Sequence, residues 1–101
     1  MRRYKLRIRP FSKTVYDKEQ ALKPLEFAAN IYEAWQGLIL YDAFVHGTEA
    51  RRAQLRGYVI HDCMNAIQAA VNILAALNIE QDEIDTAIDQ MDARNDRCGR
   101  F

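Results

Sequence analysis

Residues 57–79 read GYVIHDCMNAIQAAVNILAALNI, and this stretch decides the fold. Apolar residues recur in it every three or four positions, which is the period of an α-helix that packs one face on a neighbour. A second stretch of this kind, LKPLEFAANIYEAWQGL, occupies residues 22–38. Two long amphipathic segments in a chain of 101 residues predict one all-α domain built as an antiparallel helical bundle.

The first helix carries a favourable N-cap at Asp17. Because Pro24 lacks a backbone donor, we expect either a short helix broken near Lys23 or a main helix that starts at Pro24. From residue 25 to 45 the pattern is helical. Its recurring apolar positions, three or four residues apart, are Leu25, Ala28, Tyr32, Trp35, Ile39 and Ala43.

The signals for the next two helices are equally local. His46 and Gly47 are expected to end the first helix as a C-terminal cation and a glycine beyond the cap. Thr48 then caps a second helix that runs to Leu77, with Asn78 as its stop. A third helix is expected from residue 81 or 82, with an irregular basic tail after residue 93.

A helical projection of the second helix separates two sides around Asp62. The apolar face that should pack on the core consists of Val59, Cys63, Ile67, Ala70, Leu74 and Leu77. A polar stripe consists of Asn65, Gln68 and Asn72. Asp62 lies on the border between the two, where a carboxylate that faces a ligand is expected.

The chain divides into a basic N-terminal arm, residues 1–16, and a helical domain, residues 17–101. Residues 3–9 alternate charged and apolar side chains, a strand-like pattern that Pro10 ends, so the arm should lie extended or pair with another copy. Six positive and no negative charges precede residue 14, whereas residues 80–92 hold six acids and no base. We expect the arm to contact the acidic helix of a neighbouring subunit, and consider a nucleic-acid partner unlikely.

Composition favours a soluble protein of the cytoplasm. Half of the residues are apolar and 28% are charged. No apolar run approaches the roughly 20 residues that span a bilayer, and no signal-peptide core follows the basic N-terminus. The two cysteines, Cys63 and Cys98, lack the spacing of a disulfide framework or a metal site.

Three stretches carry a resemblance to a known family. LEFAAN at residues 25–30 fits a frame LEEAAE, and residues 59–62, Val-Ile-His-Asp, fit an ExxD motif followed by an aliphatic run. The tail adds Arg94-Asn95-Asp96-Arg97-Cys98-Gly99. Together they resemble the all-α MazG-type nucleotide pyrophosphohydrolases, which carry ExxE on one helix and ExxD on the next.

The resemblance implies an Mg²⁺ site made by four carboxylates, at positions 27, 30, 59 and 62, that activates water against a nucleoside triphosphate. In this chain those positions hold Phe27, Asn30, Val59 and Asp62, so only Asp62 keeps a carboxylate. We therefore expect a degenerate member of the family with reduced or absent hydrolysis, acting by nucleotide or protein binding.

Two hypotheses of enzyme activity stay open. A displaced metal and catalytic site could use Glu26, Glu33 and Asp62, because both glutamates lie within a turn of the expected ligand position. The spacing of Arg56 and His61 is also similar to that of HEPN-type helical ribonucleases, in which the histidine would act as acid or base.

Nucleotide binding should involve an aromatic ring for the base and donors for the phosphates. The candidates are Trp35, Asn65, Arg94, Asn95 and Arg97. The long amphipathic helices offer more apolar surface than one short chain covers, so we expect a homo-oligomer, a dimer or tetramer.

Overall fold

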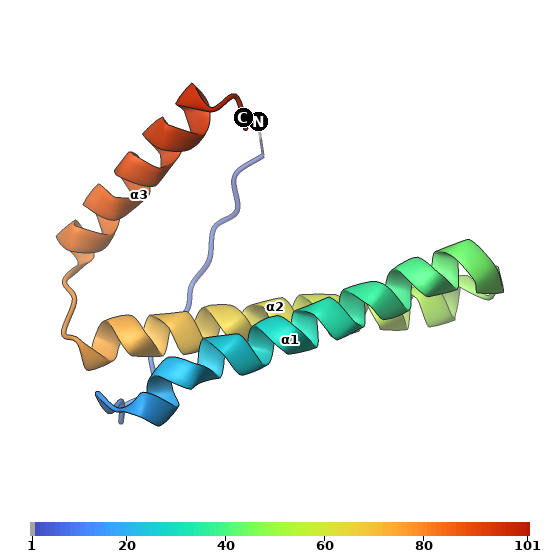
Figure 1. The fold of residues 1–101 in the computed structure, drawn as a ribbon, viewed down its shortest axis with the longest axis horizontal. Coiled ribbons are helices and arrows are strands. Elements are labelled where there is room, and N and C mark those ends of the chain that lie inside the picture. Colours follow the sequence, from blue (N-terminus) through green and yellow to red (C-terminus); the bar gives the residue numbers. More distant parts are fainter. Residues whose placement is uncertain (1) are drawn as a thin grey trace.

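The computed structural model describes residues 2–101, and over these residues it contains helices and no strand. The elements are α1 (Lys18–Leu40), the short π-helix η1 (Tyr41–Val45), α2 (Glu49–Ala76) and α3 (Gln81–Arg97). Figure 1 shows α1 and α2 side by side as an antiparallel hairpin, with α3 turned away from it. The all-α prediction is confirmed.

α1 begins where its cap predicts but passes through Pro24. The Asp17 carboxylate accepts a hydrogen bond of 2.8 Å from the Gln20 amide, as an N-cap does. Both expected alternatives at Pro24 were wrong, since the helix is continuous and contains the proline. The Gln20 carbonyl thereby loses its helical donor. Packing of α1 along α2 outweighs that local cost.

The turn between α1 and α2 depends on Tyr41 and Gly47. The left-handed residue is His46, with φ of 50°, and not the glycine that we expected there. Gly47 is required for space, because a Cβ at this position would overlap the Tyr41 side chain. The Tyr41 hydroxyl uses that space to donate a hydrogen bond of 3.0 Å to the Thr48 carbonyl.

An ion pair closes the hairpin next to this turn. The Arg52 guanidinium donates two hydrogen bonds to the Asp42 carboxylate, at 2.9 and 3.0 Å. This fork geometry is the stronger kind of ion pair. The hydrogen bond to Asp42, and then its charge, raise the pKa of Arg52 above its ordinary value.

The ends of α2 and α3 follow local signals, with one exception. Thr48 caps α2, and Asn78 ends it with φ of 55°, as expected. A capping box formed by Glu80 and Glu83 opens α3. The expectation of an irregular tail after residue 93 was wrong, because α3 continues to Arg97, and basic residues in a last turn suit the helix dipole.

The two sides of α2 are not covered in the way that the sequence predicts. Asn72, on the polar stripe, is only 4% exposed, and Ala69 beside it is only 3% exposed. In the expected apolar face, Ala70, Leu74 and Leu77 are exposed, and the other three members are half-buried. The arm covers the polar stripe at Asn72 and at the glutamine one turn before it, to which its backbone is hydrogen-bonded.

The arm lies extended and forms no strand over residues 2–16. The Phe11 amide donates to Asn72 Oδ1 at 2.9 Å, and Gln68 Nε2 donates to the Arg9 carbonyl at 2.8 Å. Arg3 lies 3.6 Å from Asp92 on α3. The arm therefore meets the acidic helix of its own chain, whereas the sequence favoured that of a neighbour.

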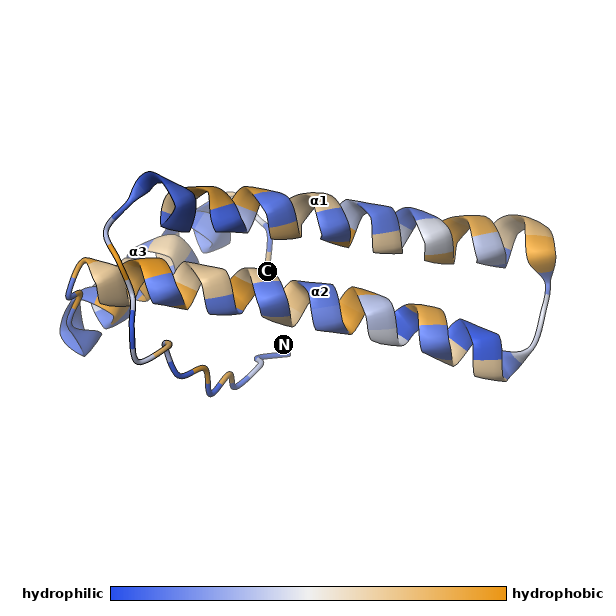
Figure 2. Cartoon of the chain, turned by 90° about the horizontal axis from the view of Figure 1, so that it is seen from below, coloured by the Kyte–Doolittle hydropathy of each residue, from blue (hydrophilic) through white to orange (hydrophobic). Residues whose placement is uncertain are grey.

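The chain is more open than its size predicts. Its radius of gyration is 16.8 Å, whereas a compact domain of about 100 residues has one of about 13 Å. Among residues 2–101, only Ala69 and Asn72 are buried, and neither is completely inaccessible. Figure 2 shows apolar residues on the outward sides of α1 and α2 as well as between them.

Contrary to expectation, α2 is long and apolar enough, by length and composition alone, to cross a membrane. Core helices of soluble proteins pass the same test. Here, however, little of the apolar window is buried within the chain. Its polar stripe is hydrogen-bonded to the arm, as described above, which is typical of a helix that packs against protein.

Candidate functional site

A pocket of about 250 Å³ opens between α1, α2 and the arm. Its rings come from Phe11 and Phe27, and Ala69 lies at its base. The polar lining consists of Gln20, Lys23, Asn65, Gln68 and Asn72. The pocket thus combines two aromatic rings, several neutral amides and a single lysine, without any carboxylate.

Two amides of α2 build one wall of this pocket. Asn72 Oδ1 accepts hydrogen bonds from the Phe11 amide and from Gln68 Nε2, at 2.9 and 3.0 Å. Gln68 also holds the Arg9 carbonyl. Residues 9–11 are therefore fixed across α2, which brings Phe11 over the pocket. The sequence predicts a polar stripe at these amides but no role for them, and the one signal of a role is their four-residue spacing in an apolar helix.

Asn65 is the polar lining residue that stays available to a ligand. Its side chain takes part in none of the hydrogen bonds formed among residues 2–101. It is half-buried and lines the pocket opposite Phe27 of α1. A free amide beside an aromatic ring offers one donor and one acceptor edge to a flat, polar ligand.

The four motif positions do not gather in this pocket. Phe27 lines it, but Asn30, Val59 and Asp62 do not. The α2 residue that shares the pocket with Phe27 is Asn65, three positions beyond Asp62. The expected pairing of residue 27 with residue 62 in one pocket was therefore displaced by one helical turn.

The displaced carboxylate site is also not assembled within one chain. Glu26 is exposed and pairs with Lys23 at 3.3 Å. Glu33 lies seven residues further, about 10 Å along the helix, too far to share one ion with Glu26. Nowhere in residues 2–101 do three or more His, Cys, Asp or Glu side chains form a group that could hold a metal ion.

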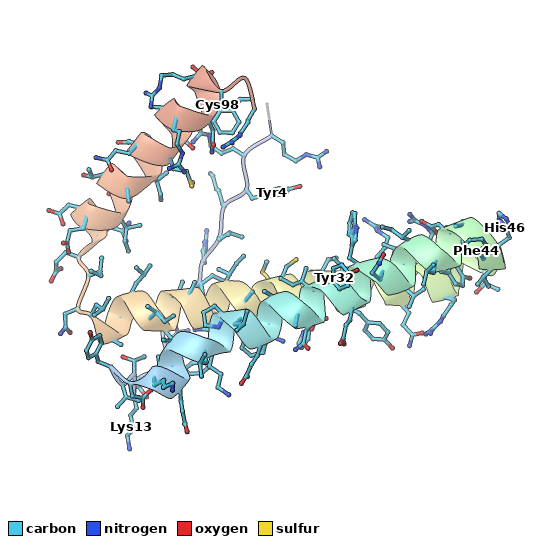
Figure 3. All side chains as sticks on the ribbon, in the orientation of Figure 1. Tyr4, Lys13, Tyr32, Phe44, His46 and Cys98 are labelled. Atoms are coloured by element: carbon cyan, nitrogen blue, oxygen red, sulfur yellow. The ribbon has the colours of Figure 1, made fainter. Side chains whose placement is uncertain are left out.

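The other expected nucleotide ligands lie away from the pocket. Trp35 is exposed on α1 and does not line it. Arg94, Asn95 and Arg97 belong to the last turns of α3, and Asn95 accepts a hydrogen bond of 2.8 Å from Arg100. Figure 3 marks this end of α3 by Cys98, well separated from the hairpin. Of the expected set, only Asn65 reaches the pocket.

Arg56 and His61 do not converge within one chain. Both are exposed on α2. Five residues on a helix correspond to a rotation of about 140° beyond one full turn, so the two side chains leave the helix in different directions. The geometry of one chain offers no support for the ribonuclease reading.

Comparison with known proteins found no relative. No family model, no curated protein and no solved structure matches this chain. The MazG-like resemblance therefore stays a prediction from the motifs.

Proposed function

We propose that this chain is a MazG-like helical protein that binds a nucleotide in the pocket beneath the arm, with reduced or absent hydrolysis. The observation that carries the proposal is the pairing of Phe27 and Asn65 in one pocket. An aromatic ring stacks on a base, and an amide hydrogen-bonds to its polar edge.

The size and charge of the pocket limit which ligands it can bind. Small-molecule pockets typically measure about 300–1,000 Å³, and this one is slightly smaller, at about 250 Å³. A base or nucleoside enters it more easily than a whole triphosphate. Lys23 is the only cation of the lining, and phosphates outside the pocket would meet it as charge-assisted acceptors.

The proposed loss of hydrolysis follows from the residue types. Phe27 and Val59 have no oxygen to offer, and Asn30 has only a neutral carbonyl. Asp62 alone is a weak site for Mg²⁺, a cation that prefers several carboxylate, water and phosphate oxygens. Magnesium is thus expected only together with bound phosphates.

Isothermal titration calorimetry with a panel of nucleoside mono- and triphosphates tests the proposal. We expect at least one nucleotide to bind, and Asn65→Ala to weaken it about tenfold through loss of the amide contact. Glu33→Gln is the matched control, since Glu33 is exposed and lies outside the pocket. Binding that is equal in the wild type and Asn65→Ala, or absent for the whole panel, contradicts the proposal.

Turnover assays with Mg²⁺ or Mn²⁺ separate a binder from an enzyme. We expect no pyrophosphate release above the background without protein. Robust release that is lost in both Glu33→Gln and Asp62→Asn would instead favour the active enzyme with a displaced site. RNA cleavage abolished by His61→Ala would favour the ribonuclease.

A further inference from the structure

α1 carries an apolar stripe that residues 2–101 leave largely exposed. Its large members are exposed: Leu25 by 68%, Tyr32 by 63%, Trp35 by 52% and Ile39 by 43%. Ala28, which lies between them, is exposed as well. Their spacing is three, four, three and four residues, which is the repeat of a seam between two helices. We call these five residues the α1 stripe.

The α1 stripe is distinct from the side of α1 that packs on α2. That side is formed by the half-buried residues Phe27, Ile31, Ala34 and Leu38. At about 100° per residue, the α1 stripe lies roughly 120° around the helix from it. The pocket opens on the other side of α1, so the stripe and the proposed nucleotide site are independent surfaces.

The exposed area shows how much surface is left uncovered. The chain exposes 8512 Å². A compact monomer of its mass, 11.7 kDa, exposes about 5,900 Å². The excess is roughly 2,600 Å² per chain. It is spread over the arm, α3 and the hairpin, so the α1 stripe supplies only part of it.

We propose that a second copy of this chain covers the α1 stripe, with the two α1 helices antiparallel about a two-fold axis near Tyr32. The stripe contains no charged residue, so no like charges oppose each other when it meets itself. A two-fold contact of this kind uses the same patch on both copies. Figure 3 shows Tyr32 half-way along the hairpin, where such an axis leaves both ends free.

Side-chain size selects the antiparallel arrangement. With Tyr32 opposite its own copy, Leu25 lies level with Ile39, and Trp35 lies level with the small residues Ala28 and Ala29. A parallel arrangement would place Trp35 against Trp35 and Ala28 against Ala28. That combination overfills one layer and leaves a void in another, and both cost stability.

Sedimentation equilibrium with matched variants tests the interface. The wild type is expected as a dimer, and Tyr32→Glu as a monomer that keeps its helical circular dichroism. The control is Tyr58→Glu, an exposed aromatic of α2 outside the α1 stripe, which should stay dimeric. Emission of the single tryptophan should move to longer wavelength in Tyr32→Glu and on dilution of the wild type. A wild type that is monomeric at all concentrations overturns the proposal.

Cysteine cross-linking tests the arrangement without destabilising the contact by charge. In a background of Cys63→Ala and Cys98→Ser, Tyr32→Cys should form a disulfide-linked dimer with itself. Leu25→Cys should link to Ile39→Cys in a mixture, and poorly to itself. Self-linking of Leu25→Cys indicates the parallel arrangement and overturns the proposed one. A monomer that instead sediments with phosphatidylcholine vesicles assigns the stripe to a membrane surface, and also overturns it.

Discussion

The side chain of Asn72 holds the backbone of the arm. Asn72 is also the most buried polar residue among residues 2–101. Its side-chain oxygen accepts two hydrogen bonds, one from the Phe11 amide and one from Gln68. A buried amide with satisfied partners contributes little net energy by itself, but removing it leaves those partners unsatisfied. Placement of Phe11 over the pocket therefore depends on one side chain of α2.

We predict that Asn72→Ala releases the arm and destabilises the chain by about 1–3 kcal/mol. Hydrogen exchange at the Phe11 amide should become as fast as in an unfolded peptide, because this donor loses its acceptor. Asn30→Ala, which removes an exposed amide of α1, serves as the control and should change stability by less than about 0.5 kcal/mol. Unchanged protection of the Phe11 amide in Asn72→Ala would show that the arm is held elsewhere.

The pocket also allows a test of metal binding at the residue scale. We predict that Phe27→Glu combined with Asn65→Asp recruits Mn²⁺, since both positions line one pocket and would bring two carboxylates together. Phe27→Glu combined with Val59→Glu should bind the ion more weakly, because Val59 does not line it. Calorimetric titration with Mn²⁺ measures both, and the reverse order would restore the pairing expected from the motifs.

At the scale of elements, glycine has opposite effects in the hairpin turn and in the interior of α2. Gly47 leaves room for the Tyr41 ring, which donates to the Thr48 carbonyl. Gly57 lies within α2, where an added Cβ would meet nothing within 4 Å. One glycine is needed by packing, whereas the other only weakens a helix.

We therefore predict opposite effects for the same substitution at these two positions. Gly47→Ala should lower the free energy of unfolding by about 1–3 kcal/mol, because it forces Tyr41 from its place. Gly57→Ala should raise it by about 0.5–1 kcal/mol through helix propensity. Urea denaturation of both variants measures the difference, and equal effects would mean that the turn does not rely on Tyr41.

At the scale of the whole molecule, openness is the dominant property. α3 diverges from the hairpin (Figure 1), and it meets the arm through Arg3 and Asp92. This pair is largely solvated and contributes little to stability. The proposed dimer would add stability by burying part of the outward apolar surface.

From this we predict that the unfolding midpoint rises with protein concentration. Because only folded chains form the proposed dimer, each tenfold increase above its dissociation constant adds about 1.4 kcal/mol per mole of dimer to the apparent stability. Thermal unfolding followed by circular dichroism over a hundredfold range of concentration provides the measurement. A midpoint that does not move would show that folded chains do not associate over this range of concentration.

How far the fold was predictable differs between elements. The predicted caps Asp17 and Thr48 lie at the starts of their helices because an N-cap acts within three residues of itself. Pro24 and the end of α3 were predicted wrongly. In the first case, packing along α2 overrode a local cost that sequence rules treat as decisive.

The candidate site was predictable only in part. Of the residues expected to bind a nucleotide, Asn65 lines the pocket, whereas Trp35 and the residues at the end of α3 do not. Gln68 and Asn72 were missed as supports of the arm. Their partners are backbone groups about 60 residues away, and no local pattern identifies such a partner.

The sequence by itself determined where the helices form, since capping, periodicity and turn residues act over a few positions along the chain. Only the tertiary structure decided which side of each helix is covered. On α2 the extended arm buries the polar stripe, because its backbone groups need the amides of Gln68 and Asn72. On α1 the stripe from Leu25 to Ile39 is left outward, since one face of a helix can pack on only one neighbour at a time.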